Sequence, residues 1–404
     1  MASSSSSSPL PASAPLHPGI SAGLTLLFAA ACGLSVANIY YAQPLIAPIA
    51  QALSLPASLA GLIMTLTQLG YGLGLLLVVP LADVVENRRL IVVALGGVVL
   101  GLVGVACSTS AATFMAAALL VGVSTVATQI MVPFASLLAP DATRGKVVGN
   151  ILGGLLAGIM LARPFASSVA ALWGWRTVFA ISAALMLVLM AVLHRMLPQR
   201  RPMAAQSYGR ILASLPSIVR RTPLLRRRAA YQGAMFAGFN AFWTGVPLLL
   251  AHAFGMGQHG IAAFALAGAA GALVAPWAGR LADRGLTRAA TGWALACAVL
   301  AFGLAGWAGY SRSLPGLVAA ALVLDAAVQV CQVLSLRSIY MLAPELRGRL
   351  NGLFMTMVFV CGAVASGLST AVYTLAGWPA LAAMGAAFIA VALAFYATEF
   401  AARK

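Results

Sequence analysis

The chain has 404 residues, of which 62% are hydrophobic and only 8% are charged. A soluble globular domain carries about 25% charged residues, so these charges are too few to cover a soluble surface. A disordered chain is excluded as well, because disorder requires low hydrophobicity. The net charge of +17 would suggest nucleic acid in a soluble protein, but no nucleic-acid partner is expected here. The composition predicts a polytopic membrane protein whose surface faces the lipid bilayer.

The chain opens with a Ser-, Pro- and Ala-rich stretch at 1–18. This stretch lacks the basic start and the cleavage pattern of a signal peptide, so we expect a disordered cytoplasmic tail. Twelve apolar runs follow, each long enough for a transmembrane helix of roughly 20 residues. They lie near 20–47, 57–80, 89–107, 112–138, 146–171, 176–196, 229–252, 259–281, 289–309, 315–341, 350–373 and 378–399.

An Arg- and Pro-rich break separates the sixth run from the seventh. We expect a cytoplasmic basic linker there, with a short amphipathic helix near 209–221. The predicted fold is an all-α integral membrane protein with 12 transmembrane helices, arranged as two pseudo-symmetric six-helix bundles. The expected domains are the tail at 1–18, the N-terminal bundle at 19–196, the linker at 197–228 and the C-terminal bundle at 229–404.

Basic residues gather in alternate loops. Twenty of the 24 Lys and Arg residues lie at the C-terminal end, in the region 195–228 and in four loops, near 88–89, 144–146, 280–288 and 347–349. The intervening loops hold only Arg176 and Arg312. The positive-inside rule therefore places both termini in the cytoplasm.

The two halves of the chain repeat at an offset of 200–204 residues. Four pairs of motifs match in order: Asn38-Ile-Tyr-Tyr with Asn240-Ala-Phe-Trp, Leu81-Ala-Asp83 with Leu281-Ala-Asp283, Pro140-Asp141 with Pro344-Glu345, and Gly174-Trp175 with Gly377-Trp378. Both halves have the same orientation, so the repeat is parallel. It predicts six spans plus six around an axis normal to the membrane.

With these motifs, residues 20–400 resemble the major facilitator superfamily. The loop signature of the family, roughly G-x-L-A-D-R-x-G-R-R, is kept at Gly279-Arg-Leu-Ala-Asp283-Arg284-Gly285 and degraded at 80–89. The fifth run resembles the antiporter signature through Gly149 and Gly158, with Ala162-Arg163-Pro164 in place of Gly-Pro. The fourth run lacks the arginine often seen in proton antiporters of the family and has Ser124, Thr125, Thr128 and Gln129 instead.

The run Asn38-Ile-Tyr-Tyr-Ala-Gln-Pro and Leu324-Asp325 with Gln329 resemble a bacterial subgroup of drug- or metabolite-efflux carriers. This resemblance implies a multi-pass protein of the bacterial inner membrane that moves a small molecule by alternating access. It also implies a monomer.

Asp325 is the only carboxylate well inside a predicted span. It lies about ten residues, or roughly 15 Å, from the end of that span. An ionised group at this depth costs several kcal/mol unless it is paired, solvated or protonated. We expect Asp325 to bind and release a proton during transport. The alternatives are a permanent ion pair and binding of a cationic substrate.

Arg163 lies at a similar depth in the other half. In the family fold, the fifth and tenth spans can approach each other across a central cavity. The hypothesis is therefore an Arg163–Asp325 pair that forms or breaks with the protonation of Asp325. The alternative is that Arg163 extends outward or binds carbonyl groups that Pro164 leaves exposed.

Amides, hydroxyls and aromatic rings lie in the spans that line the cavity of the family. Such groups suit an uncharged or amphipathic small-molecule substrate. The candidate substrate-binding residues are Asn38, Tyr41, Gln43, Gln68, Tyr71, Thr128, Gln129, Asn240, Trp243, Thr244, Gln329 and Gln332. The alternative for each is a hydrogen bond between helices.

A candidate cytoplasmic gate lies at the ends of the second and eighth spans. It consists of Asp83, Arg88, Arg89, Asp283 and Arg284. The resemblance implies that these charges latch the two halves in the outward-facing state. The alternative is ordinary solvated loop charges.

The leading interpretation is a secondary transporter that exports a small organic solute by proton antiport, with Asp325 as the exchange point. Proton symport or uncoupled uptake of a metabolite is the alternative. No HExxH, GxSxG or GxxxxGK[ST] motif occurs, so neither an enzyme nor an ATPase is expected. No cofactor or metal is expected, and the proton is the expected coupling ion.

Overall fold

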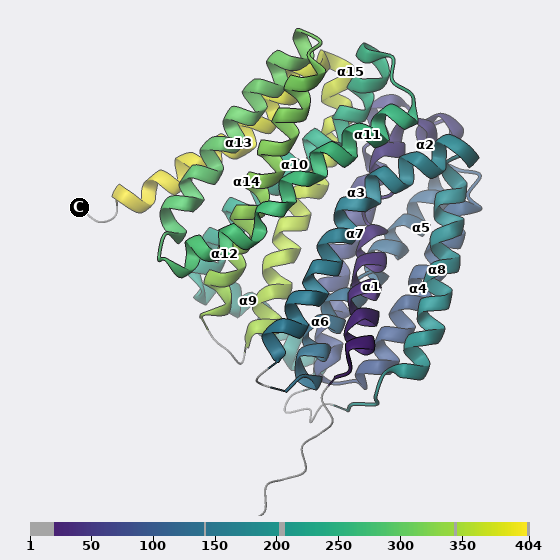
Figure 1. Cartoon of the computed structure of the whole chain (residues 1–404), viewed down its shortest axis with the longest axis vertical. Coiled ribbons are helices and arrows are strands. Elements are labelled where there is room, and N and C mark those ends of the chain that lie inside the picture. The colour runs from purple at the N-terminus through teal and green to yellow at the C-terminus, as the bar shows by residue number, and fades with distance from the viewer. Residues whose placement is uncertain (1–19, 141–142, 202–206, 343–345, 402–404) are drawn as a thin grey trace, which may run out of the picture.

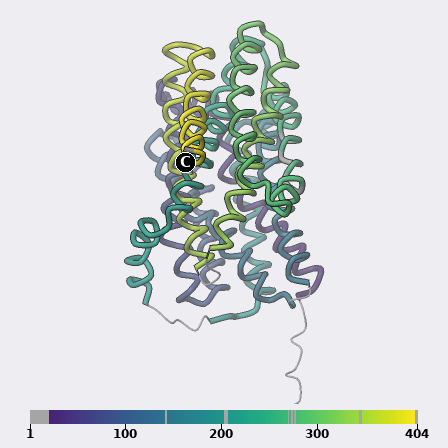
Figure 2. Tube along the Cα trace, turned by 90° about the vertical axis from the view of Figure 1, so that its left-hand side faces the viewer, coloured from purple at the N-terminus to yellow at the C-terminus, as the bar shows by residue number. Residues whose placement is uncertain are grey.

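The computed structural model describes residues 20–140, 143–201, 207–342 and 346–401, and every element within them is helical. The long helices stand side by side along the long axis of the molecule (Figures 1 and 2). The predicted tail at 1–18 lies outside the described residues. The prediction of an all-α membrane fold is confirmed.

The first half of the chain forms eight α-helices and three short 3₁₀ helices. Their bounds are α1 Ala22–Ala37, η1 Gln43–Leu45, α2 Ile46–Ala52, η2 Ala57–Leu59, α3 Leu62–Leu77, η3 Val79–Asp83, α4 Asn87–Ala106, α5 Ala111–Ser124, α6 Ala127–Leu138, α7 Arg144–Trp173 and α8 Trp175–Met196.

The linker helix and the second half follow. Their bounds are α9 Tyr208–Arg221, α10 Pro223–Phe254, α11 Gln258–Ala269, η4 Ala270–Val274, α12 Ala275–Asp283, α13 Thr287–Tyr310, α14 Leu314–Tyr340 and α15 Arg347–Ala401.

Nine helical segments in the described part of the chain are long and apolar enough to cross a membrane. The longest, α15, holds two predicted spans, because the backbone leaves the helical conformation at Gly377. The passages through α1 and α2 and through α11 and α12 supply the remaining two spans in broken form. The twelve predicted passages are therefore accounted for.

Among the passages that the sequence predicts as continuous, the first, the fourth and the eighth are interrupted well inside the predicted run. The first span ends as a helix at Ala37 and continues through η1, which has Pro44 in its first turn. The fourth breaks between α5 and α6, where the Thr125 hydroxyl donates to the Val121 carbonyl at 2.7 Å, a local bond that competes with regular helix geometry. The eighth breaks at η4.

The Gly-Trp pair that repeats in the two halves lies at an equivalent turn in each half. Gly174 has φ 83° and Gly377 has φ 73°, a left-handed region that glycine adopts without steric cost. Each is followed by a buried indole, and Trp175 and Trp378 both pack edge-on against a phenylalanine ring at 5.9 Å. The turns at Gly174 and Gly377 therefore share a backbone conformation and a type of aromatic packing.

Glycines allow a close helix crossing between α1 and α7 in the first half. A Cβ added to Gly158 of α7 would lie 2.1 Å from the carbonyl oxygen of Gly33 in α1. Small residues at a crossing let helix backbones approach closely in lipid. This contact holds α7, and with it Arg163, against α1.

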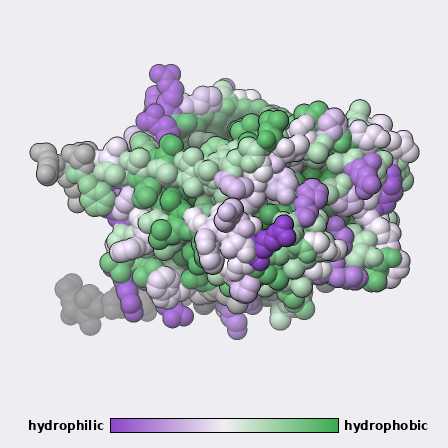
Figure 3. All heavy atoms as spheres, turned by 90° about the horizontal axis from the view of Figure 1, so that it is seen from above, coloured by the Kyte–Doolittle hydropathy of each residue, from purple (hydrophilic) through white to green (hydrophobic). Residues whose placement is uncertain are grey.

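The two ends of the molecule differ. We call the end with the turn between η3 and α4 and with the linker helix, which begins at Tyr208, the linker end; it lies toward the bottom of Figure 1. The opposite end carries the turns at Gly174 and Gly377. Figure 3 looks onto this opposite end, where hydrophobic residues reach the surface between scattered hydrophilic ones.

The predicted amphipathic helix of the linker is present as α9. Ile211 and Leu215 are buried, whereas Arg220 and Arg221 are exposed. The hydroxyl of Tyr208 donates to the carbonyl of Leu77 at 2.7 Å. The linker is thereby held against the end of α3.

Candidate functional site

A cavity of about 400 Å³ lies between the two halves. It extends from Arg163 and Asp325 in the middle of the molecule to Tyr340 and Asn351 near the linker end. Most of its walls are aliphatic or aromatic. Its polar and charged lining residues are Tyr40, Tyr71, Gln129, Arg163, Gln232, Asp325, Gln329, Gln332, Tyr340 and Asn351. A mostly apolar cavity with a few convergent polar groups is typical of small-molecule sites.

Hydrogen bonds between the halves close the opposite end. Thr370 of α15 accepts from the backbone N–H of Gly61 at 2.9 Å and donates to the carbonyl of Ser58 at 3.0 Å. One turn further along α3, Thr65 donates to the carbonyl of Ala363 at 2.9 Å. Helices α7 and α11 also pack together across the halves. The cavity therefore extends toward the linker end alone.

A chain of side-chain hydrogen bonds crosses the cavity between the halves. Tyr340 donates to Asn351 Oδ1 at 3.1 Å, and Asn351 Nδ2 donates to Gln129 Oε1 at 3.1 Å. Gln129 Nε2 then donates to the Tyr71 hydroxyl at 3.0 Å. Helices α14, α15, α6 and α3 are joined by these groups, so the chain must break or move when the halves separate at the linker end.

The two deep charges contact the same indole, Asp325 at its N–H edge and Arg163 over a ring face. Trp243 Nε1 donates to Asp325 Oδ1 at 2.8 Å. The Arg163 guanidinium carbon lies 4.4 Å from the Trp243 ring centroid, a cation–π contact. Trp243 thus joins the carboxylate of α14 to the arginine of α7.

The hypothesised direct Arg163–Asp325 pair is not formed in this structure. Within the described ranges, no carboxylate oxygen lies within the 4.0 Å ion-pair limit of an Arg163 nitrogen. Arg163 Nε donates instead to Gln43 Oε1 at 2.8 Å. The charges of Arg163 and Asp325 still interact through space. The alternative of an outward-extended arginine is wrong too, because Arg163 is only 3% exposed.

Two glycines make room for this arrangement. A Cβ on Gly268 of α11 would lie 2.7 Å from the Trp243 ring, and one on Gly271 of η4 would lie 2.9 Å from Asp325 Cβ. The broken eighth passage therefore lies directly against the indole and the carboxylate. Any larger residue at these two positions would displace one of them.

Four of the twelve candidate substrate-binding residues line the cavity: Tyr71, Gln129, Gln329 and Gln332. The other eight do not appear in its wall. They are Asn38, Tyr41, Gln43, Gln68, Thr128, Asn240, Trp243 and Thr244.

Contacts between helices account for several of these eight. Asn38 accepts from the Ser182 hydroxyl of α8 at 2.6 Å, and Gln68 of α3 donates to Asn240 of α10. Thr244 donates to the Ser366 hydroxyl at 3.5 Å. For these side chains, the alternative of a hydrogen bond between helices describes the structure.

Several cavity residues were missed by sequence reasoning. Tyr40 lies inside the repeated Asn38 motif, and Asn351 lies just after the basic loop near 347–349, so the sequence contained a signal for both. Gln232 and Tyr340 lie toward the linker ends of α10 and α14, where a polar side chain in a span is less unusual than in its middle.

The five candidate gate residues do not join the halves in this structure. Asp283 forms an ion pair with Arg337 of its own half. Asp83, Arg89 and Arg284 are exposed. Within the described part of the chain, Asp83 forms no ion pair.

The first basic loop of the first half, near 88–89, is shaped by a residue outside the candidate gate. The Glu86 carboxylate caps α4 by accepting the backbone N–H groups of Arg88 at 3.0 Å and Arg89 at 3.1 Å. Arg88 Nη1 also donates to the carbonyl of Leu197 at 3.4 Å. These two arginines are therefore held by contacts within the first half.

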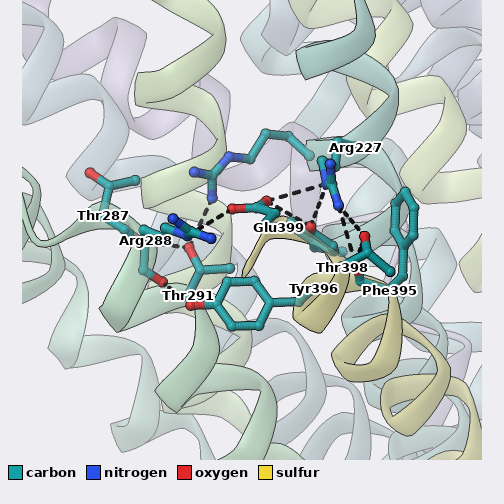
Figure 4. Close-up of polar contacts among 10 residues, drawn as sticks. Arg227, Thr287, Arg288, Thr291, Phe395, Tyr396, Thr398 and Glu399 are labelled. Atoms are coloured by element: carbon teal, nitrogen blue, oxygen red, sulfur yellow. Dashed lines mark hydrogen bonds and ion pairs between the residues drawn. The ribbon is translucent and has the colours of Figure 1, made fainter. Parts of the chain in front are cut away.

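A second cluster of charges connects helices at the linker end of the second half (Figure 4). Glu399 of α15 pairs with Arg227 of α10 at 3.3 Å and with Arg288 of α13 at 3.2 Å. Tyr231 donates to the same carboxylate at 2.7 Å. The cluster joins three helices of one half and does not reach the cavity.

Comparison with known proteins assigns the fold to a family. A family model described as Major Facilitator Superfamily matches residues 25–324. The chain is 41% identical over 379 residues to the uncharacterized transporter YgaY of Escherichia coli O157:H7, which covers 93% of this chain and 95% of that protein. It is 31% identical over 399 residues to the probable transporter SCO4007 of Streptomyces coelicolor, with 96% and 92% covered.

Two solved structures share the fold at low identity. The nucleoside transporter NupG superimposes with a TM-score of 0.74 at 15% identity and covers 93% of this chain and 99% of its own. An inward-facing bacterial homologue of the human lysosomal transporter Spinster also has a TM-score of 0.74, at 14% identity, with 93% and 95% covered. At this identity the likeness concerns the fold alone.

Proposed function

The chain belongs to the major facilitator superfamily, and on that basis we propose that it exports a small organic solute in exchange for protons. The family and these relatives are membrane-embedded transporters of small molecules and not enzymes. The proton coupling, the outward direction and the role of Asp325 are the parts that we propose.

The position of Asp325 supports proton coupling. It lines the cavity between the halves and is 7% exposed. An ionised carboxylate at this depth is costly without compensation, and the Trp243 N–H and the charge of Arg163 supply part of that compensation. A proton supplies the rest by removing the charge. A carboxylate held between these two states is suited to binding and releasing a proton.

The same position supports exchange. A solute that fills the cavity reaches Asp325 and displaces a proton from it, so that proton and solute bind in alternation. We propose that the basic linker end faces the cytoplasm of a bacterium, that both termini lie there, and that the protein is a monomer without a nucleic-acid partner. The cavity described above would then extend toward the cytoplasm, and a solute for export would load once the hydrogen bond between Asn351 and Gln129 breaks.

The gate fits this orientation. In an inward-facing state, the halves are apart at the linker end, so Asp83 and Asp283 form no ion pair with the other half. We propose that the five gate residues come together when the linker end closes. The candidate residues Tyr71, Gln129, Gln329 and Gln332 line the cavity and are proposed to contact the solute.

Acidified inverted membrane vesicles loaded with a pH-sensitive dye test the proposal. Benzoate, thymidine, chloramphenicol, ethidium and lysine are added one at a time to the wild type, Asp325→Asn and Asp325→Glu. Alkalinisation of the lumen by the wild type and Asp325→Glu, but not by Asp325→Asn, is the expected result. Equal responses from all three would place the coupling site elsewhere, and further acidification on addition of solute would indicate symport.

A further inference from the structure

The charge cluster around Glu399 holds more positive than negative charge (Figure 4). Arg227 and Arg288 both pair with this one carboxylate. Arg228 reaches the same junction, where its Nη1 donates at 2.8 Å to the hydroxyl of Thr291, one turn along α13 from Arg288. Within the described ranges, no carboxylate pairs with Arg228. Three cations therefore share one anion where α10, α13 and α15 meet.

The arginines, more than the carboxylate, form the outer side of the cluster. The side chains of Arg227 and Arg288 are 30% and 31% exposed, whereas that of Glu399 is 20% exposed. In both arginines, Nη1 is accessible and donates no hydrogen bond within the described residues. Arg288 Nε is buried without a hydrogen-bond partner, so its ion pair with Glu399 lacks hydrogen-bond geometry. The cluster thus presents cationic donors that Glu399 does not satisfy.

Exposed tryptophans near both ends of α13 indicate the depth of the cluster. Trp293 lies near the linker end of this helix and Trp307 lies in its last turn, and both are exposed. Exposed indoles are enriched where a bilayer meets water. Arg288 lies five residues before Trp293, which is about 8 Å closer to the linker end. The cluster therefore lies at the level of the lipid headgroups.

Each of the two outer arginines also lies over an exposed aromatic ring. The guanidinium carbon of Arg227 is 4.7 Å from the ring centroid of Phe395, and that of Arg288 is 3.8 Å from the ring centroid of Phe400. Both rings are exposed at the surface of α15. Cations beside exposed apolar rings suit an amphipathic anion, whose charge meets the arginines while its apolar part covers the rings. A free inorganic anion would leave the rings uncovered.

The bilayer itself supplies such an anion at this depth. Guanidinium groups bind phosphate oxygens through strong, often bidentate hydrogen bonds. Basic sites between transmembrane helices at the cytoplasmic side bind anionic lipid headgroups. An anionic headgroup also brings the negative charge that the cluster lacks, whereas a zwitterionic headgroup brings no net charge.

We propose that Arg227 and Arg288 bind the phosphodiester of an anionic phospholipid, and that the buried charge of Arg228 strengthens this binding. The acyl chains of the lipid would lie beside Phe395 and Phe400. A bound lipid would connect α10, α13 and α15 from outside, next to the linker helix that precedes α10. The site lies outside the transport cavity and does not depend on the direction of transport, on Asp325 or on the solute.

Native mass spectrometry of the purified protein in detergent tests the proposal. Phosphatidylglycerol, which is anionic, and phosphatidylcholine, which is zwitterionic, are titrated separately, and each titration is repeated with added inorganic phosphate. Tighter binding of phosphatidylglycerol, unchanged by an equal concentration of phosphate, is the expected result. Equal binding of the two lipids would overturn the proposal. Displacement of phosphatidylglycerol by phosphate would show a site for free anions and would overturn it too.

Two double variants with the same change of charge locate the site. Arg227→Gln with Arg288→Gln should weaken binding of phosphatidylglycerol about fivefold for each arginine removed. Arg220→Gln with Arg221→Gln removes two exposed arginines from the linker helix at the same end and should leave the tight binding unchanged. Equal weakening in both double variants would mean that the lipid senses only the net charge of this end, which contradicts the proposed site.

The single variant Arg288→Gln gives the same test with the least damage to the fold. The Arg288 side chain donates no hydrogen bond within the described part of the chain, so its replacement breaks only the ion pair and the contact with Phe400. About fivefold weaker binding of phosphatidylglycerol is expected. Binding equal to that of the wild type would exclude Arg288 from the site and overturn the assignment.

Discussion

The bonds of Thr370 hold the opposite end closed, and replacing this residue with valine removes them at nearly constant shape. The hydroxyl makes two contacts across the halves, at 2.9 Å to Gly61 N and 3.0 Å to the Ser58 carbonyl. A net hydrogen bond is worth about 0.5–1.5 kcal/mol, so the loss of both costs about 1–3 kcal/mol. That corresponds to a factor of about 5–150 in the ratio of closed to open molecules.

Spin labels on the two halves measure this ratio. Gln51 of α2 and Leu375 of α15 are exposed at the opposite end, and each is replaced by a labelled cysteine in a cysteine-free background. Thr370→Val is expected to enlarge the long-distance population in double electron–electron resonance. Thr374→Val is the matched control, because the Thr374 hydroxyl bonds only the carbonyl of Thr370 in its own helix.

Equal distance distributions for Thr370→Val and Thr374→Val would contradict this prediction. The closure would then depend on helix packing and not on these hydrogen bonds. A shift in both variants would point to a general loosening of α15. A shift in Thr370→Val alone is the predicted outcome.

Three further changes have expected outcomes. Gln129→Leu breaks the chain to Tyr71 and Asn351, so spin labels at the linker end should show more open molecules, the reverse of Thr370→Val; no change there would contradict the gating role of the chain. Gly158→Ala places a Cβ 2.1 Å from a backbone oxygen and should lower the melting temperature by the equivalent of about 1–3 kcal/mol. Gly149→Ala is the control: a Cβ there has no neighbour within 4 Å, so the melting temperature should not fall. Glu399→Gln removes two ion pairs and should lower the free energy of unfolding by about 1 kcal/mol. This loss should shrink in high salt, because salt screens such pairs. A loss that does not depend on salt would contradict an ionic origin.

Much of the fold could be predicted from the sequence, because lipid leaves few options. Long apolar runs must be helices in a bilayer, and their count predicted the number of passages. The repeat identified Gly174 and Gly377 as equivalent, and both have the same unusual backbone conformation. The internal breaks were missed, because the local bond of Thr125 has no counterpart in hydropathy.

The candidate site could be predicted only in part. Asp325 and Arg163 stand out because a deep charge is rare, and both line the cavity. Their separation could not be predicted, since Trp243 reaches between them only once α7, α10 and α14 are packed. Asn38 and Gln68 were assigned to the cavity because a helix that is apolar all round does not reveal which face meets its neighbours.

The proton on Asp325 is the central claim, and infrared spectroscopy of the purified protein tests it without a known substrate. The carbonyl stretch of a protonated carboxyl group is recorded against pH for the wild type and Asp325→Asn. The account predicts a band that titrates in the wild type and is absent from Asp325→Asn. Identical spectra for the two proteins in this region at every pH would contradict it, because Asp325 would then stay ionised throughout; a wild-type band that does not change with pH would contradict it too, because Asp325 would then stay protonated.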